Sequence, residues 1–306
     1  MVWMAALGIA LVAGLVLIID DDDDSTTDTS GGSDTDGGTD TGGGADIDSF
    51  IGASGDDEIE GDDENNTILG KNGTDTLDGN AGDDRVFGDG GNDSVQGGEG
   101  NDSVFGGNGE DLVKGGEDDD LVRGGRNDDV LIDSTGADRL QGDGGDDLIV
   151  ASGTMDADAA AAFETNPVPD NGIGNLLDQL LIDFSADSDT EGDEAFGGSG
   201  DDTVIFGVND TVGGGSGADT FVTASWLEGQ DAATVTDFDP AEDQLMYAYD
   251  PAEGVPELTV EMVENDDGTT DAIVSANGSE VIRVLEQDDT FDLSENILLI
   301  NGVRAA

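Results

Sequence analysis

Carboxylate side chains recur every nine residues between Gly52 and Val150. Eleven consecutive units read roughly Gly-x-x-Gly-x-Asp-x-apolar-x, and only Asn66 breaks the run of aspartates at the sixth place. Histidine and cysteine are absent from the chain, so a metal held here would be bound by oxygen atoms. Six to eight flexible oxygen ligands favour Ca²⁺ over octahedral Mg²⁺. The repeat therefore predicts several calcium sites, built by Asp57, Asp75, Asp84, Asp93, Asp102, Asp111, Asp120, Asp129, Asp138 and Asp147.

The same repeat predicts the fold that positions these carboxylates. If each unit is a six-residue loop followed by a three-residue strand, two units complete one turn, and equivalent residues stack at a spacing of about 4.8 Å. The apolar eighth place, from Ile59 to Ile149, then points between two thin sheets. Glycine at the first and fourth places permits a positive φ. We therefore expect an all-β protein, a parallel β-roll with loops along both edges.

Stacking of this kind brings like charges together. Asp75 would lie beside Asp93, and Asp84 beside Asp102. Two carboxylates at such a spacing repel each other unless a cation lies between them. The alternative is that aspartate and glycine serve only as turn formers. Turn formation alone does not require aspartate at one place and glycine at two others, so we favour one calcium ion between each pair of stacked loops.

A shorter second block follows, and it predicts two further calcium ligands, Asp202 and Asp219. These two residues are seventeen positions apart, so one residue is missing from that turn. Some loops of the main block also depart from the pattern. The loop from Gly61 to Asn66 lacks its second glycine, and other glycines are replaced by Asp118, Asn127 and Asp133.

Both blocks resemble the RTX (repeats-in-toxin, haemolysin-type) calcium-binding family. In that family the sixth-place aspartate and carbonyl groups of the glycine-rich loop hold the ion. The resemblance carries over best to the loops that keep both glycines, those of Asp57, Asp75, Asp84, Asp93, Asp102 and Asp111. The stretch from Thr236 to Leu245 is similar to the segment that follows the repeats in this family. Secreted members commonly carry a carboxy-terminal export signal, and the apolar start of this chain departs from that pattern.

The composition restricts the partners of the chain. With 74 acidic and 8 basic residues, the formal net charge is −66, which excludes nucleic acid as a partner. One aliphatic side chain per nine residues is too small a core to offset self-repulsion and chain entropy, so we expect the metal-free repeat to be largely disordered. Extracellular calcium modules bind at about 10⁻⁴ to 10⁻³ M. The repeat is therefore expected to fold outside the cell, in the medium or at the cell surface.

Residues 2–19 form an uninterrupted apolar run that is just long enough to span a bilayer. We expect an uncleaved membrane anchor, with a signal segment as the alternative, because no small-residue cleavage pattern precedes Asp20. Five aspartates, Asp20 to Asp24, follow and favour an outside location for the rest of the chain. The stretch from Thr26 to Gly44 contains only Ser, Thr, Asp and Gly, which predicts a flexible tether.

Between the two blocks, apolar residues from Ile173 to Phe184 follow the spacing of one helical face. We expect this helix to cover an apolar patch on the outside of the roll, formed by Leu112, Val130, Ile132, Leu148 and Val150. The alternative is a dimer contact at the same patch. After Phe221 the strands lengthen, which predicts an antiparallel β cap whose core contains Trp226, Phe238, Tyr247, Tyr249 and Phe291.

These patterns divide the chain into six parts. They are a membrane anchor or signal segment (1–19), an acidic linker (20–45), the RTX β-roll (46–150), a helical insert (151–187), a second RTX block (188–222) and a C-terminal β cap (223–306).

The expected protein is not an enzyme, because every close carboxylate pair already has a role as a metal ligand. The rival function is a surface adhesin or structural stalk that calcium only stiffens, with a cell-surface or matrix partner. That partner would be bound by the cap or by the outward ladder of Leu69, Phe87 and Phe105. The alternative is that this ladder has only a structural role, as cross-strand packing that stabilises the sheet.

Overall fold

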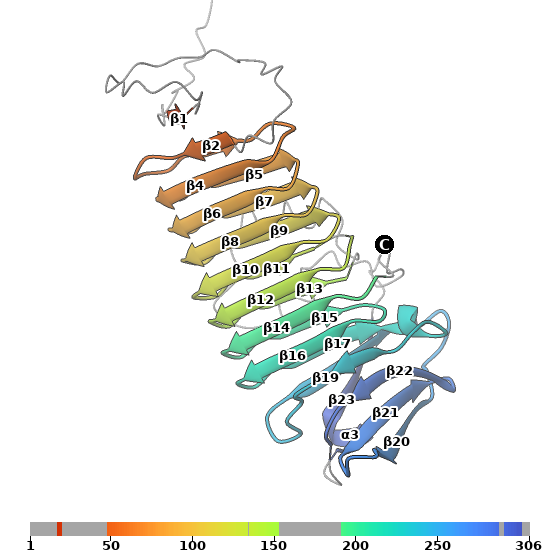
Figure 1. Ribbon diagram of the computed structural model, residues 1–306. Helices are drawn as coiled ribbons and strands as arrows, with labels where there is room; N and C mark the ends of the chain where they lie inside the picture. The colour runs from red at the N-terminus through yellow and green to blue at the C-terminus, as the bar shows by residue number, and fades with distance from the viewer. Residues whose placement is uncertain (1–16, 20–47, 134, 153–190, 288–290, 302–306) are drawn as a thin grey trace, which may run out of the picture.

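Two sheets of stacked strands face each other along the length of the molecule (Figure 1). The computed structural model describes residues 17–19, 48–133, 135–152, 191–287 and 291–301. The chain alternates between the sheets, so that even-numbered strands from β2 to β18 form one sheet and odd-numbered strands from β3 to β19 form the other. This arrangement is the predicted parallel β-roll.

The first sheet holds thirteen strands, taken here in spatial order. They are β1 (Leu17–Ile19), β2 (Asp48–Ile51), β4 (Asn66–Asn72), β6 (Arg85–Gly90), β8 (Ser103–Asn108), β10 (Leu121–Arg126), β12 (Arg139–Gly144), β14 (Glu194–Ser199), β16 (Thr211–Ser216), β18 (Ala233–Val235), β22 (Ser279–Val284), β21 (Thr270–Ala276) and β20 (Leu258–Glu264).

The second sheet holds ten strands. They are β23 (Ile297–Asn301), β19 (Gln244–Tyr249), β17 (Thr220–Ala224), β15 (Thr203–Phe206), β13 (Leu148–Ala151), β11 (Val130–Ile132), β9 (Leu112–Glu117), β7 (Ser94–Glu99), β5 (Thr76–Ala81) and β3 (Glu58–Glu60). Two short helical turns, η1 (Ser225–Leu227) and α3 (Leu293–Asn296), lie near the C-terminal end.

The predicted eighteen-residue register is confirmed. Val86 pairs with Val104 in one sheet, and Val95 pairs with Val113 in the other. Most strands of the main block are six residues long rather than the three we expected. Each strand continues from the end of one unit into the first three places of the next unit, where pairing between turns goes on, as between Gly107 and Gly125. The loops also stack through backbone bonds, such as the Gly91 N–H to the Asn108 carbonyl at 2.9 Å.

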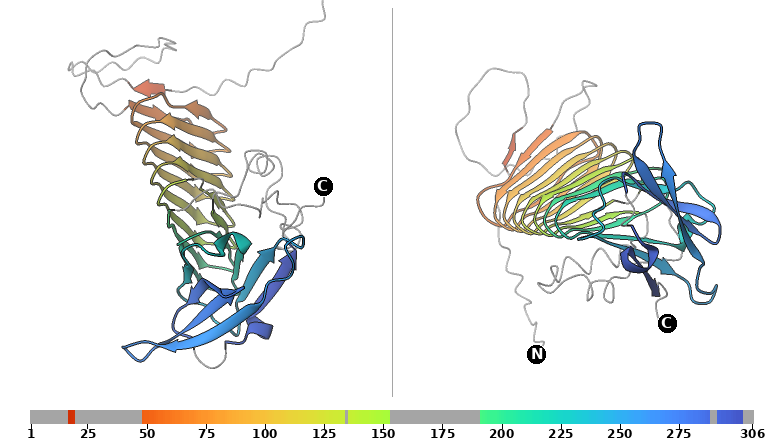
Figure 2. Two further views of the ribbon diagram at one scale, coloured as in Figure 1. Left: turned by 90° about the vertical axis from the view of Figure 1, so that its right-hand side faces the viewer. Right: turned by 90° about the horizontal axis from the view of Figure 1, so that it is seen from below.

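Eighth-place side chains form the interior of the roll. From Ile59 to Ile149 they are at most 2% exposed. Figure 2 shows the stacked strands from a second side and from below. One aliphatic row from each sheet fills the space between the two sheets, so this part of the fold has little apolar burial per residue to stabilise it.

The positions of positive φ correct one expectation. The fourth place has a positive φ as predicted, for example at Gly91 (φ 144°), but the other such position is the second place, as at Asp89 (φ 69°), and not the first. First-place glycines are required for another reason. A Cβ at Gly88 would lie 2.6 Å from both Asp93 Oδ2 and the carbonyl oxygen of Gly106.

The two repeat blocks form one continuous stack. β12 pairs in parallel with β14 although Arg139 and Glu194 are far apart in sequence, and β13 pairs with β15 in the same way. The missing residue of the second block is confirmed, since Asp202 donates its N–H to Asp219 Oδ1 across seventeen positions. The strands on the two sides of the insert therefore pair directly with one another.

The cap closes the C-terminal end with both parallel and antiparallel strands. β18, β19 and β23 continue the two sheets in parallel, and β20, β21 and β22 add an antiparallel meander with turns at 266–268 and 277–278. Phe238 contacts Phe221 and Phe291 at ring-centroid distances of 5.9 and 5.5 Å. Tyr247 is fully buried, so the predicted aromatic core is present, although the Trp226 side chain lies outside the described part.

The outer apolar patch is buried. Leu112, Val130, Ile132, Leu148 and Val150 cluster on the outside of the second sheet, and all are at most 8% exposed. The cluster extends to Ile205 and Val222 of the second block. The helix predicted for residues 173–184, which we expected to cover this patch, lies outside the described residues.

Most of the predicted anchor also lies outside the described residues. Its last three residues, Leu17–Ile19, form β1, which pairs antiparallel with β2. In the parts of the chain that the structure describes, no helix combines the length and the apolar character needed to cross a bilayer. The linker at 20–45 is not described.

We predict that the segment 173–184 supplies the cover of the outer patch. Replacing Leu177 and Leu181 with serine should then expose the patch, raise the fluorescence of a hydrophobic dye and lower the Tm in calcium. Asp178→Asn, on the polar side of the predicted helix, is the control. Equal dye binding by the two variants would mean that another segment provides the cover.

Candidate metal centres

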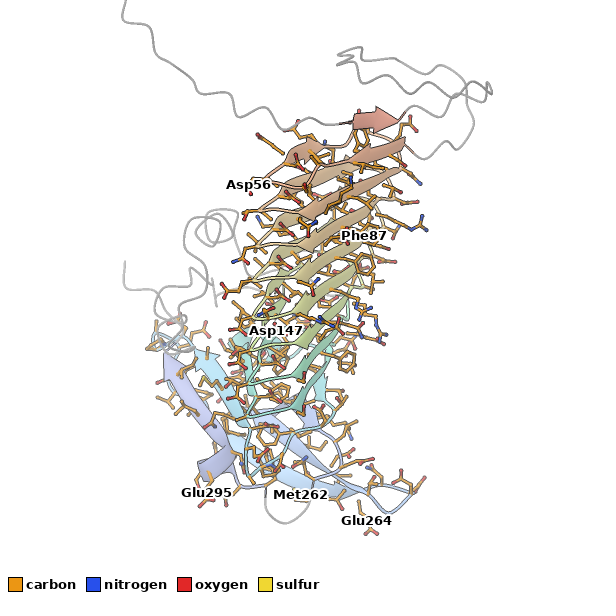
Figure 3. All side chains as sticks on the ribbon, turned by 90° about the vertical axis from the view of Figure 1, so that its left-hand side faces the viewer. Asp56, Phe87, Asp147, Met262, Glu264 and Glu295 are labelled. Atoms are coloured by element: carbon orange, nitrogen blue, oxygen red, sulfur yellow. The ribbon has the colours of Figure 1, made fainter. Side chains whose placement is uncertain are left out.

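Sixth-place aspartates form a hydrogen-bonded ladder along each edge of the roll. The backbone N–H of each residue donates to Oδ1 of the aspartate one turn later, at 2.6–3.0 Å. One edge holds Asp57, Asp75, Asp93, Asp111, Asp129, Asp147, Asp202, Asp219 and Asp243. The other edge holds Asn66, Asp84, Asp102, Asp120, Asp138, Asp193 and Asp210. Figure 3 labels Asp147 on the first edge.

The second carboxylate oxygen of these residues has no hydrogen-bond donor over most of the roll. This holds for Asp75, Asp84, Asp93, Asp102, Asp111, Asp120, Asp129, Asp147 and Asp202, all of which are between 0% and 4% exposed. A buried acceptor without a partner costs about 1–3 kcal/mol, and more when it is charged. A row of such oxygens calls for a common ligand that is not a protein donor.

The orphaned oxygens point into small cradles between successive turns. At Gly88, the space that a Cβ would occupy is bounded by Asp93 Oδ2 and by the carbonyl oxygen of Gly106 in the next turn. The arrangement repeats at Gly106, where a Cβ would lie 2.6 Å from Asp111 Oδ2 and 2.9 Å from the Gly124 carbonyl oxygen. These two cradles each bring two acceptors together, which fits a hard cation such as Ca²⁺.

Burial makes these carboxyl groups poor acids in the absence of a cation. It raises the pKa to about 6 at Asp84, about 7 at Asp102, about 8 at Asp120 and about 9 at Asp129, against an ordinary value of 3.8. The donated backbone N–H opposes the shift, and the stacked carboxylates of neighbouring turns add to it. A bound cation would reverse the effect by favouring the ionised form.

The first turn of the roll closes its open end with side-chain donors. Lys71 Nζ donates to the Gly52 carbonyl oxygen at 2.6 Å, and Asn80 Nδ2 donates to that of Gly61 at 2.8 Å. In later turns the equivalent carbonyl oxygen faces an aspartate Oδ2 of the preceding turn. Lys71 therefore places a positive charge beside a carbonyl of the type that lines the inner cradles.

Loops that depart from the repeat sequence differ in whether they keep an aspartate oxygen without a hydrogen-bond donor. Asp118 and Asn127 adopt a positive φ of 73° and 72°, as the glycines they replace do, and Asp120 and Asp129 keep their orphaned oxygens. Asp57 differs, because its Oδ2 accepts the Ala53 N–H at 2.7 Å. In the degenerate loop, Asn66 Oδ1 likewise accepts the Asp62 N–H. The first loop on each edge is thus satisfied within the protein.

Several ladder residues were missed by the sequence analysis. Asp193, Asp210 and Asp243 continue the two ladders, but irregular spacing in the second block and in the cap hid them. A further ladder uses the fifth place, where a side-chain oxygen accepts the N–H one turn later, as between Asp83 and Asn101. The signal was present in the sequence, since Asp or Asn holds this place at Asp56, Asn65, Asp83, Asn92, Asn101, Asp119, Asp128 and Asp146.

Filling a cradle with one methyl group should weaken cation binding. In Gly88→Ala the new Cβ would collide with Asp93 Oδ2 and the Gly106 carbonyl, an overpacking that costs about 1–3 kcal/mol. Gly90→Ala, in the same loop, is the control, because its nearest neighbour would be 3.5 Å away. We expect the Tm in calcium to fall only for Gly88→Ala, and a fall of equal size in both variants would contradict the cradle.

Acid should partly replace calcium. Because the pKa of these aspartates is raised in the folded state, the protonated form favours folding, and this stabilisation is lost as the pH rises through about 6 to 9. In EDTA, β structure measured by circular dichroism should therefore increase between pH 9 and pH 5. With saturating calcium the trend should be absent or reversed. A metal-free chain that loses β structure on acidification would contradict the assignment.

Comparison with known proteins agrees with this geometry. The family described as RTX calcium-binding nonapeptide repeat (4 copies) matches residues 42–77, 60–95, 87–122, 96–131, 123–153 and 188–208. No curated protein matches the sequence.

Among solved structures, an extracellular lipase, LipA from Serratia marcescens, aligns with 81% of this chain and 39% of its own length, at 13% identity and a TM-score of 0.23. The aligned region is thus less than half of the lipase, and such a TM-score does not establish a shared fold. RTX nonapeptide repeats bind calcium, and the described roll has the two-sheet architecture that we expected of them. The repeats of this chain, within residues 42–153 and 188–208, therefore belong to the RTX calcium-binding nonapeptide family.

Proposed function

We propose that this chain is an exported or cell-surface calcium-binding protein whose roll folds when external calcium binds. The observation that carries the proposal is the row of buried aspartate oxygens that have no donor and face carbonyl oxygens of the next turn. The proposed ligands are the predicted aspartates of the inner turns, from Asp75 to Asp147, with Asp202 and Asp219 of the second block. Asp57 is the weakest of the predicted ligands, because Ala53 already satisfies its Oδ2.

Calcium binding and folding are coupled in this proposal. A net charge of −66 opposes compaction, and the carboxylates that must come together are themselves buried in the roll. Each bound ion would neutralise part of that charge and link two successive turns. Since the thin core gives little independent stability, the binding free energy becomes folding free energy. The protein would then be unfolded at cytosolic calcium concentrations and folded outside the cell.

The proposed role is not catalytic. The chain has no histidine or cysteine, and the buried carboxylates are engaged in the ladders. Calcium ions are the proposed partners, and nucleic acid is excluded by charge. Residues 2–19 would serve as a membrane attachment and residues 20–45 as a linker. The β cap, residues 223–306, would protect the last edge of the two sheets.

A second candidate is an adhesin or stalk in which calcium only stiffens the repeat. It is favoured by the half-buried pair Phe87 and Phe105 on the outside of the first sheet. Their rings stack with centroids 4.9 Å apart and an interplanar angle of 3°. Figure 3 labels Phe87 on this strand face. Replacing both rings with serine separates the two roles. Loss of binding to a cell surface at unchanged Tm would favour the adhesin, whereas a lower Tm would mean that the rings only stabilise the sheet.

Calcium titration of the full chain tests the main proposal. We expect a cooperative gain of β structure by circular dichroism between about 10⁻⁴ and 10⁻³ M calcium, with several ions bound by calorimetry. Magnesium is the control, and it should be inert at the same concentrations because the cradles supply flexible oxygen ligands. A chain that is already fully folded in EDTA would contradict the coupling and make the stalk the better account.

A further inference from the structure

One cradle contains a third carboxylate. Asp133 occupies the first place of its unit, where the other units of the main block have glycine. Its Oδ2 lies beside the space that a Cβ at Gly115 would fill, together with Asp120 Oδ2. In a regular cradle the corresponding neighbour is a carbonyl oxygen of the next turn, such as that of Gly106 beside Gly88. Asp133 thus puts a charged oxygen where other cradles have a neutral one.

Three aspartates converge at this point. Asp120, Asp133 and Asp138 can each direct one carboxylate oxygen into a group whose members lie within 4.8 Å of one another, the one such trio found in the described part of the chain. All three side chains are at most 4% exposed. Asp120 Oδ2 has no hydrogen-bond donor and points into the group. This orphaned oxygen is independent evidence for a ligand.

We propose that Asp120, Asp133 and Asp138 form a distinct cation site that binds calcium more tightly than the other cradles of the roll. The proposal rests on the proposed function, because it assumes that the cradles bind calcium. Affinity for calcium rises with the number of charged ligands and with the rigidity of the site. Here three carboxylates share one ion, and the Gly116 N–H fixes the other oxygen of Asp133 at 3.1 Å.

The site lies where the two repeat blocks meet. Asp133 donates its N–H to the Val150 carbonyl at 3.0 Å, which ties this loop to the last strand before the insert. Asp138 donates its N–H to Asp193 Oδ1 at 2.9 Å, which ties it to the first strand after the insert. An ion held here first would bring together segments 55 residues apart in the chain before the weaker sites fill.

The test is a calcium titration of the full chain by calorimetry, with terbium luminescence as a second readout. We expect one ion to bind at least tenfold more tightly than the rest, and terbium, with its higher charge, to occupy the same site first. Asp133→Asn keeps the shape and removes the charge, and Asp133→Gly restores the residue of the ordinary units. Both should lose the tight phase. Glu117→Gln, which removes an exposed charge from the repeat unit of Asp120, should keep the tight phase.

The outcomes separate this site from the proposed function. A single class of calcium sites in the native chain, or a tight phase that survives in Asp133→Asn, would overturn the three-carboxylate site and leave calcium binding by the roll intact. Circular dichroism at saturating calcium shows whether each variant folds. If Asp133→Asn does not fold, the titration of Asp133→Gly decides the question. A native chain that binds no calcium would overturn the proposed function and this site together.

Discussion

The structure depends on buried carboxylate oxygens that the protein itself does not satisfy. Each ladder aspartate uses one oxygen to accept a backbone N–H from the preceding turn, which fixes the register between turns. In the inner turns the other oxygen has no donor, and at Asp84, Asp93 and Asp111 it lies beside a carbonyl oxygen of the next turn. Two acceptors facing each other are unfavourable without a cation or a proton. The same residue therefore holds the backbone of two turns together and, under the proposed function, would make the fold dependent on a cation.

The other features of the chain are consistent with this constraint. First-place glycines leave room for the cradle, and the interior of the roll holds only a thin row of aliphatic side chains. The two ends of the roll differ from its middle. At the N-terminal end, Lys71 and Ala53 donate hydrogen bonds to the first turn, and at the C-terminal end one ladder finishes at Asp243 in the cap. Under the proposed function, the net charge of −66 would keep the chain expanded until cations bind.

Much of the fold could be predicted from the sequence, because a strict nine-residue period fixes both register and side-chain direction. The burial of Leu77 and Val104 and the stacking of Phe87 on Phe105 followed directly from it. The direction of the aspartate oxygens did not, since spacing places a residue but not its hydrogen bonds. Asp133 seemed a defect in the repeat, and only the three-dimensional arrangement shows it beside Asp120 and Asp138. The strands of the cap were found, but their parallel pairing with the roll requires long-range contacts that no local pattern encodes.

The most direct measurement is the anomalous diffraction of calcium in crystals of the chain grown with the ion. We expect a peak in each inner cradle along both edges, between an aspartate Oδ2 such as that of Asp93 and the first-place carbonyl of the next turn, and no peak beside Asn66. An ordered roll whose cradles hold no ion, with the aspartates paired to donors instead, would contradict the account.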